Sequence, residues 1–145
     1  MDAIRRFRGE YFFLSNFYET NVTIDGLTFP SSEAAFQAQK TMNSFFRNKF
    51  TYLNPVRAKH LGNEVPLRED WDTYRDEAMY RAVKAKFEQN DWIRELLIRT
   101  GDAYLEEGNR WHDTYWGTVN GVGKNMLGKT LMRVREELRA NEKAS

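Results

Sequence analysis

Three acidic residues stand where a carboxylate could do chemistry: Glu33, Glu107 and Asp113. Glu33 lies in a stretch otherwise rich in Ala and Phe, and the other two lie in a segment rich in Trp and Tyr. Together with Lys40 and Lys86, this set suits hydrolysis at an anomeric carbon. There a carboxylate stabilises the developing oxocarbenium or iminium ion, and a second carboxyl protonates the leaving group or activates water. Aromatic rings would hold a base, and arginine a phosphate.

Other chemistries are disfavoured by what the chain lacks. It contains no Cys, which removes thiol nucleophiles, Cys-ligated zinc and disulfides, and its 2 His residues show no metal-ligand spacing. Serine-hydrolase signatures are also missing. We therefore expect no metal and no cofactor, and a reducing, cytoplasmic location fits the absence of Cys.

Composition bounds the partners. No long apolar run follows the first residues, 1–6, so no signal peptide is expected, and no stretch is long enough to span a membrane. The formal net charge is +1, so bulk attraction to nucleic acid is not expected, although a local basic patch is possible. The sequence does not predict an oligomeric state.

The Glu33 segment, residues 29–40, reads as a strand end, a turn and a short helix. A hydroxyl of Ser31 or Ser32 can cap that helix. Glu33, Gln37 and Lys40 are spaced four and three apart, so they share one helical stripe. That stripe is either an exposed ion-pair face, which spacing alone favours, or a functional face.

A hairpin is predicted to lead into this helix. Residues 21–30 alternate apolar and polar side chains around Asp25-Gly26, a strong two-residue turn signal. In that register Ile24 faces Leu27 and Val22 faces Phe29.

Residues 70–90 form the longest segment with helical periodicity. Trp71, Met79 and Ala82 fall on its apolar side, and two cations, Arg75 and Lys86, fall there too. A cation pointed at a core is costly unless it is paired or solvated. Either these side chains reach the rim, or they face a polar cavity that holds an anion.

The remaining elements are shorter. We expect helices at 55–61, 92–99 and 129–140, a short strand at 103–106 and a frayed tail at 141–145.

The aromatic run 7–18 either packs in the core, which is the favoured interpretation, or lines a pocket. Residues 107–117 form a loop, and glycine-rich residues 121–128 precede the last helix, where backbone amides could hold phosphate. Arg135 lies at the edge of that helix's apolar stripe. The chain, 1–145, is thus predicted to be one mainly α (α+β) domain with a small N-terminal β-hairpin and short strands.

Several motifs together resemble those of the YbiA-like, or NADAR (NAD and ADP-ribose), family. The resemblance runs in order over nearly the whole chain, which makes the set specific although each motif is short. The motifs are residues 13–18, 29–40, Trp71, Arg75, Met79, Lys86-Phe87, 107–109, Asp113, Trp116-Gly117, 125–128, Leu131-Met132 and Arg135.

The resemblance implies a YbiA-like helical fold and a metal-independent N-glycosidase that cleaves the bond between ribose C1′ and an exocyclic amine. The implied substrates are ribosylaminopyrimidine phosphates of riboflavin synthesis, or ADP-ribose on the guanine amino group, free or in nucleic acid. It implies catalytic roles for Glu33, Lys40, Trp71 and Asp113. It places substrate or phosphate binding at Arg75, Lys86, Glu107, Trp116, Gly117, Asn125, Gly128 and Arg135, and stacking at Phe12 or Phe17.

Two other functions are compatible with the same residues. The cations and rings could form a non-catalytic module that binds ADP-ribose or a nucleotide. Alternatively, basic residues at both 5–8 and 47–49 could serve a nucleic-acid-binding or toxin-neutralising protein.

Overall fold

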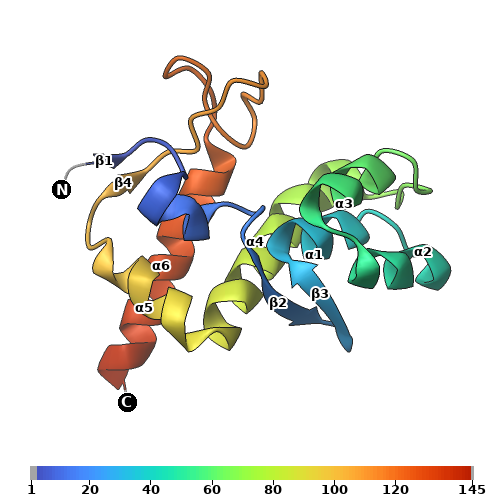
Figure 1. Ribbon diagram of the computed structural model, residues 1–145, viewed down its shortest axis with the longest axis horizontal. Helices are drawn as coiled ribbons and strands as arrows, with labels where there is room; N and C mark the ends of the chain where they lie inside the picture. Colours follow the sequence, from blue (N-terminus) through green and yellow to red (C-terminus); the bar gives the residue numbers. More distant parts are fainter. Residues whose placement is uncertain (1–2, 145) are drawn as a thin grey trace. The chain divides into compact units, whose positions relative to one another are not determined.

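Local sequence signals account for most of the helices in the computed structural model, which describes residues 3–144 (Figure 1). The fold is mainly helical with two small two-stranded sheets, which confirms the predicted α+β class. Contacts divide the described chain into two units, residues 16–90 and residues 3–15 with 91–144. The prediction of one domain over 1–145 stays a prediction.

The hairpin of the unit 16–90 consists of β2 (Glu19–Ile24) and β3 (Leu27–Ser31). Ile24 pairs with Leu27 and Val22 with Phe29, so the predicted register is confirmed. Asp25 and Gly26 both have positive φ, 53° and 81°, as a tight two-residue turn requires.

The helix that follows, α1 (Ser32–Ala38), begins as the sequence predicts. The Ser31 hydroxyl accepts a hydrogen bond from the Ala34 backbone N–H, and all seven residues of the helix are buried. The helix ends at Ala38, so the prediction that Lys40 lies within it is wrong. Asn43 provides the next capping side chain, two residues beyond the turn at 39–41.

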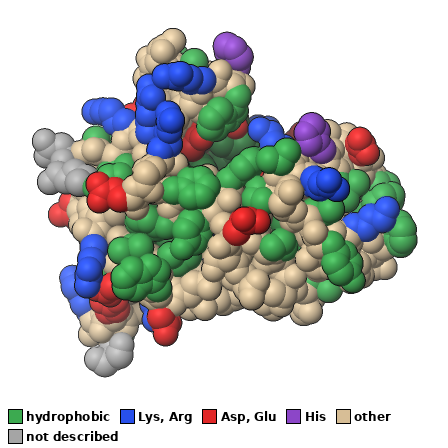
Figure 2. Space-filling view, viewed as in Figure 1, with side chains coloured by type: hydrophobic (Ala, Val, Ile, Leu, Met, Phe, Trp, Pro, Cys, Tyr) green, Lys and Arg blue, Asp and Glu red, His purple; other side chains and the backbone are tan. Residues whose placement is uncertain are grey.

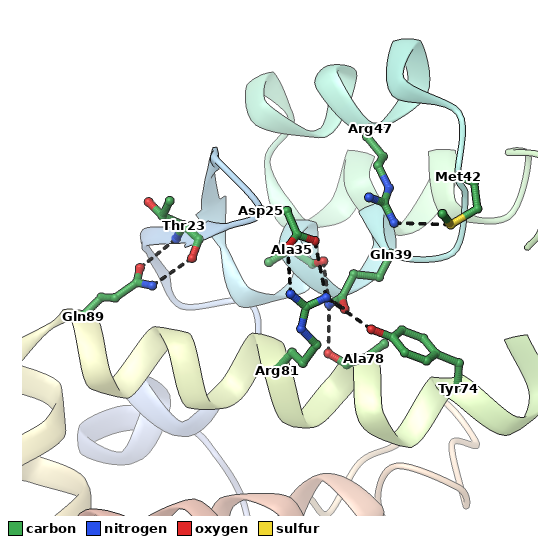
Figure 3. A network of polar contacts seen from close by, with 10 residues as sticks. All are labelled: Thr23, Asp25, Ala35, Gln39, Met42, Arg47, Tyr74, Ala78, Arg81 and Gln89. Atoms are coloured by element: carbon green, nitrogen blue, oxygen red, sulfur yellow. Dashed lines mark hydrogen bonds and ion pairs between the residues drawn. The ribbon is translucent and has the colours of Figure 1, made fainter.

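Helix α4 (Trp71–Gln89) matches the predicted long helix, and it contacts both α1 and β2. Figure 3 shows the polar network between these elements: the Arg81 guanidinium bonds the Asp25 carboxylate at 2.9 Å, the Tyr74 hydroxyl at 3.2 Å and the Gln39 side-chain oxygen at 3.4 Å. The Gln89 amide exchanges two hydrogen bonds with the Thr23 backbone, at 2.7 and 2.8 Å. These bonds hold the hairpin and the end of α1 on α4.

The segment between α1 and α4 holds one predicted and two unpredicted elements. Helix α3 (Pro55–Gly62) is confirmed, with the Asn54 side chain capping it and Pro55 at its first position. Helix α2 (Ser44–Lys49) and the 3-10 turn η2 (Phe50–Tyr52) were not predicted, because residues 42–53 show no clear periodicity.

The other unit joins segments distant in sequence. Strand β1 (Ala3–Ile4) pairs in parallel with β4 (Tyr104–Leu105), and a 3-10 turn, η1 (Gly9–Leu14), follows β1. Phe7, Phe13 and Leu14 are buried, which confirms the core interpretation for these members of the aromatic run. Strand β4 lies within the predicted span 103–106.

Two helices complete this unit. Helix α5 (Asp91–Arg99) agrees with the prediction, whereas α6 (Met126–Ala144) is longer at both ends than the predicted 129–140. Its first turn takes in three residues assigned to the glycine-rich loop, and its last turn replaces the predicted frayed tail. Two predictions included residues that lie outside the described ones: the signal-peptide prediction included Met1 and Asp2, and the tail prediction included Ser145. Among the described helices, none is both long and apolar enough to cross a membrane.

Candidate functional site

Glu33 lies in the first turn of α1 and is only 8% exposed. One carboxylate oxygen, Oε2, accepts a hydrogen bond of 2.7 Å from the Gln37 side-chain amide, one helical turn away. The position near the helix N-terminus also favours a negative charge. The interpretation of this stripe as an exposed ion-pair face is therefore wrong.

Asn16 fixes the start of α1. Its backbone oxygen accepts from the Glu33 N–H at 3.1 Å, and its side-chain oxygen accepts from the Ser32 hydroxyl at 2.9 Å. The Asn16 side-chain nitrogen in turn lies 3.2 Å from the Met79 sulfur on α4. The residue before Glu33 and the backbone of Glu33 itself are thus held from one loop position.

The Gln37 side chain packs closely against α3 at Gly62, where a glycine leaves room for it. A Cβ atom at Gly62 would lie 1.9 Å from Gln37 Oε1 and 2.7 Å from Gln37 Cδ. Gln37 is 5% exposed, and its Oε1 has no hydrogen-bond partner among the described residues. The glycine therefore leaves room for the Gln37 rotamer that donates to Glu33.

Lys40 joins these residues from the turn after α1. Its ammonium lies 3.4 Å from the Gly62 backbone oxygen and 5.9 Å from the centroid of the Trp71 ring. Burial lowers the pKa of Lys40, while the nearby Glu33 charge acts in the opposite direction. Glu33 and Lys40 are thus brought near each other although they do not share a helix.

Trp71 completes what we call the Glu33 cluster: Glu33, Gln37, Lys40, Gly62 and Trp71. The Trp71 ring is 9% exposed and packs on the Phe36 ring, with centroids 5.4 Å apart and planes tilted by 55°. The cluster therefore combines a buried carboxylate, an amine of lowered pKa and an indole within the unit 16–90.

The two cations on the apolar side of α4 have different environments. Lys86 has no exposed surface, and its ammonium lies 5.5 Å from the Tyr18 ring centroid and 5.0 Å from that of Phe87. Burial lowers its pKa to about 7. Lys86 therefore does not reach the rim, whereas Arg75 is half-buried. Their predicted phosphate contacts stay predictions, as does stacking by the half-buried Phe17.

In the other unit, Asn109 organises the loop that carries Glu107 and Asp113. The Asn109 side-chain nitrogen donates to Glu107 Oε1 and to the Asp113 backbone oxygen, both at 2.9 Å. Its oxygen accepts from the Asp113 N–H at 3.1 Å. The carboxylate of Asp113 accepts from the N–H groups of Tyr115 and Trp116, at 3.1 and 2.8 Å. This carboxylate therefore also shapes its own loop.

Gly117 and Gly128 are sites of close approach between backbones. A Cβ at Gly117 would lie 2.1 Å from the Glu107 backbone oxygen and 1.9 Å from its carboxylate, and one at Gly128 would lie 2.1 Å from the Leu105 backbone oxygen. Gly128 belongs to helix α6, so the predicted phosphate-binding turn 125–128 is mostly helical. These contacts explain both glycines without a ligand.

Asn125 and Arg135 also have partners within their own unit. The Asn125 side chain is 2% exposed, accepts from the Glu107 N–H at 2.9 Å and donates to the Leu105 oxygen at 2.8 Å. The Arg135 guanidinium, 6% exposed, donates to the Thr100 hydroxyl at 2.9 Å, and burial lowers its pKa. Their binding roles stay predictions.

Two aromatic candidates remain in this unit. Trp116 is half-buried and packs edge-to-face on Tyr115, with centroids 4.8 Å apart. Phe12 is 42% exposed, so its ring is accessible for stacking.

A pocket of about 560 Å³ in the unit 16–90 is lined by residues 41–43 and 66–70, none of which is a predicted site residue. The lining adjoins the Glu33 cluster, because the Arg68 backbone N–H donates to the Lys40 backbone oxygen at 2.7 Å. Across residues 3–144, no group of three His, Asp or Glu side chains is arranged to hold a metal ion.

The sequence analysis assigned no site role to the residues that position the carboxylates, although it placed Gln37 on the Glu33 stripe and Asn16 and Asn109 within the family motifs. Asn16, Gln37 and Gly62 support Glu33, and Asn109 supports Glu107 and Asp113. Gln37 carried a usable signal, because it lies four residues after Glu33 on a helix. The contacts of Asn16 and Gly62 bridge distant segments and leave no local signature.

Comparison with known proteins identifies the fold and its relatives. The model of the NADAR domain matches residues 5–139. The chain is 40% identical over 133 residues to N-glycosidase YbiA of Shigella boydii, covering 89% of this chain and 82% of that protein. It is 39% identical over 130 residues to a riboflavin biosynthesis protein of Vibrio vulnificus, covering 87% of this chain and 35% of that longer protein.

A solved structure agrees with these matches. The NMR structure of Escherichia coli YbiA superposes with a TM-score of 0.86 at 37% identity, covering 98% of this chain and 88% of that one.

Proposed function

The chain belongs to the NADAR family, and we propose that it is an N-glycosidase that hydrolyses the bond between ribose C1′ and an exocyclic amine. The observation that carries this proposal is the Glu33 cluster, in which a buried carboxylate is bonded by Gln37 and lies near Lys40. The name N-glycosidase, borne by relatives that match most of this chain, supports the same chemistry.

The proposed substrates are ribosylaminopyrimidine phosphates or guanine that carries ADP-ribose on its amino group. Both contain an aminal carbon bonded to an amine nitrogen, so one reaction serves for both. The name of the Vibrio vulnificus relative supports the first class.

In the proposed reaction the C1′–N bond breaks and its electron pair leaves with the amine nitrogen, which takes a proton. A water oxygen bonds to C1′ and gives up a proton, so the products are the free sugar and the free amine. Glu33 stabilises the positive charge that develops at C1′, or moves one of these protons. The amine of Lys40, whose pKa is lowered by burial, is suited to trap the opened sugar as a Schiff base that water then hydrolyses.

The other predicted roles form part of the proposal. Trp71 bounds the reacting sugar, Asp113 is a catalytic carboxylate, and rings at Phe12, Phe17 and Trp116 stack. Substrate or phosphate binding is assigned to Arg75, Lys86, Glu107, Gly117, Asn125, Gly128 and Arg135. We also propose that the reaction needs no metal and that the enzyme acts in the cytoplasm.

The direct test is incubation of the protein with ribosylaminouracil phosphate and with guanosine ADP-ribosylated on its amino group, with and without EDTA. We expect release of ribose phosphate or ADP-ribose, at the same rate in both conditions. Saturable binding of ADP-ribose by calorimetry without release from either substrate would instead identify a non-catalytic binding module. A rate abolished by EDTA and restored by a metal would contradict metal independence.

Asp113→Asn separates the structural role of this side chain from a catalytic one. The amide oxygen of the new side chain can still accept from the N–H groups of Tyr115 and Trp116, so we expect the loop and the melting temperature to be kept. Loss of the charge should lower kcat by ~10²-fold, the contribution of a typical acid–base group. An unchanged kcat would leave Asp113 a loop-forming residue only.

A further inference from the structure

Helix α2 is a surface helix without a buried residue, yet it displays aromatic side chains. Phe45 on this helix is 63% exposed, and Tyr52, at the end of η2, is 86% exposed. Exposed apolar rings that gather on one segment indicate an interaction surface. At the right of Figure 2, where Figure 1 places α2 and α3, hydrophobic and basic side chains lie together.

The charge of this segment is one-sided. Residues 41–63 contain four of the 22 Lys and Arg residues and none of the 21 Asp and Glu residues. Lys49, Arg57 and Lys59 are exposed, and within residues 3–144 none of the three forms an ion pair with an acidic side chain. The segment is therefore basic although the whole chain is almost neutral.

The Lys49 side chain lies beside two aromatic rings of the segment 41–63. The Lys49 ammonium lies 4.7 Å from the centroid of the Phe45 ring and 5.7 Å from that of Phe46. Arg47 is bonded through its Nε to the Thr41 backbone oxygen at 2.7 Å, which leaves its position well defined.

We propose that this α2 surface, made of Phe45, Arg47, Lys49, Tyr52, Arg57 and Lys59, binds single-stranded nucleic acid. The cations complement phosphates. The two exposed rings offer surfaces on which unpaired bases of any type can stack. Aromatic rings also occur at protein interfaces, so an acidic protein is the alternative partner that the test below distinguishes. The proposal does not depend on the glycosidase activity proposed above.

Fluorescence anisotropy with a labelled deoxythymidine strand of about 20 nucleotides tests this, since single-strand sites span ~4–16 nucleotides per fold. The double variant Phe45→Ala/Tyr52→Ala keeps every charge and should weaken binding by at least ~10-fold, because stacking stabilises each base substantially. Lys49→Ala should reduce the slope of log affinity against log salt by ~0.7, the value for one phosphate contact on a single strand. Tyr52→Ala alone, at the more exposed position, serves as a milder ring variant.

Matched controls lie in the other unit. Trp92→Ala removes a ring that is 71% exposed, and Lys129→Ala removes an exposed cation. Both should bind the strand as the wild type does, and hydrolysis of a small ribosylamine should be unchanged in all these variants. Absence of binding at low salt, equal affinity of the wild type and the ring variant, or equally tight binding of polyglutamate of matched length would overturn the proposal; the last result would assign the surface to an acidic protein.

Discussion

Glu33→Gln is expected to lower kcat for ribosylamine hydrolysis by ~10²-fold or more, the range that acid–base catalysis supplies. The substitution removes the charge and the proton-transfer capacity of a carboxylate that is 8% exposed. It keeps the side-chain shape. The oxygen of the introduced amide can still accept the hydrogen bond that the Gln37 amide donates to Glu33 at 2.7 Å in the wild type. Because this contact is retained, the loss should appear in kcat rather than in the melting temperature.

The matched control is Glu77→Gln on the exposed face of α4, the same chemical change where we assign no catalytic role. Single-turnover measurements on both variants, together with thermal unfolding, separate catalysis from folding. A kcat within a few-fold of the wild type in Glu33→Gln would remove Glu33 from the mechanism while leaving the family assignment intact.

Lys86→Met is expected to stabilise the protein at neutral pH and to flatten its pH dependence. Burial lowers the pKa of Lys86 from 10.5 to about 7. Between these two values the unfolded chain binds more protons than the folded one, so the free energy of unfolding rises with pH through this window. The rise attributable to Lys86 is at most ~1.4 kcal/mol per pH unit.

The cost of the buried ammonium is therefore full below pH 7 and vanishes above pH 10.5. Met retains most of the volume and cannot be charged, so the variant should lose this rise and gain up to ~4 kcal/mol at pH 7. Urea unfolding across the window measures both effects, and Lys129→Met at an exposed position is the control. A variant that is less stable than the wild type at pH 7, with the pH slope intact, would show that the charged Lys86 side chain stabilises the fold instead of destabilising it.

Elements with local signals could be predicted from the order of the amino acids. The Asp25-Gly26 turn, the Ser31 cap and the Asn54-Pro55 helix start each depend on a few neighbouring residues, and the helical period of 71–89 belongs to one continuous segment. At these elements the local preference agrees with the final fold. The ordered set of short motifs also determined the NADAR family, which the comparisons confirm.

The faces that these elements bury depend on how the folded chain packs, and local signals do not predict them. Spacing alone favours a solvated ion-pair face for the α1 stripe, and only packing against α3 and α4 makes Glu33 a buried carboxylate. Three further contacts join residues far apart in the chain: the close approach of Gln37 to Gly62, the hydrogen bond between Ser32 and Asn16, and the parallel pairing of β1 with β4. Such contacts depend on chain closure, and no local propensity encodes them.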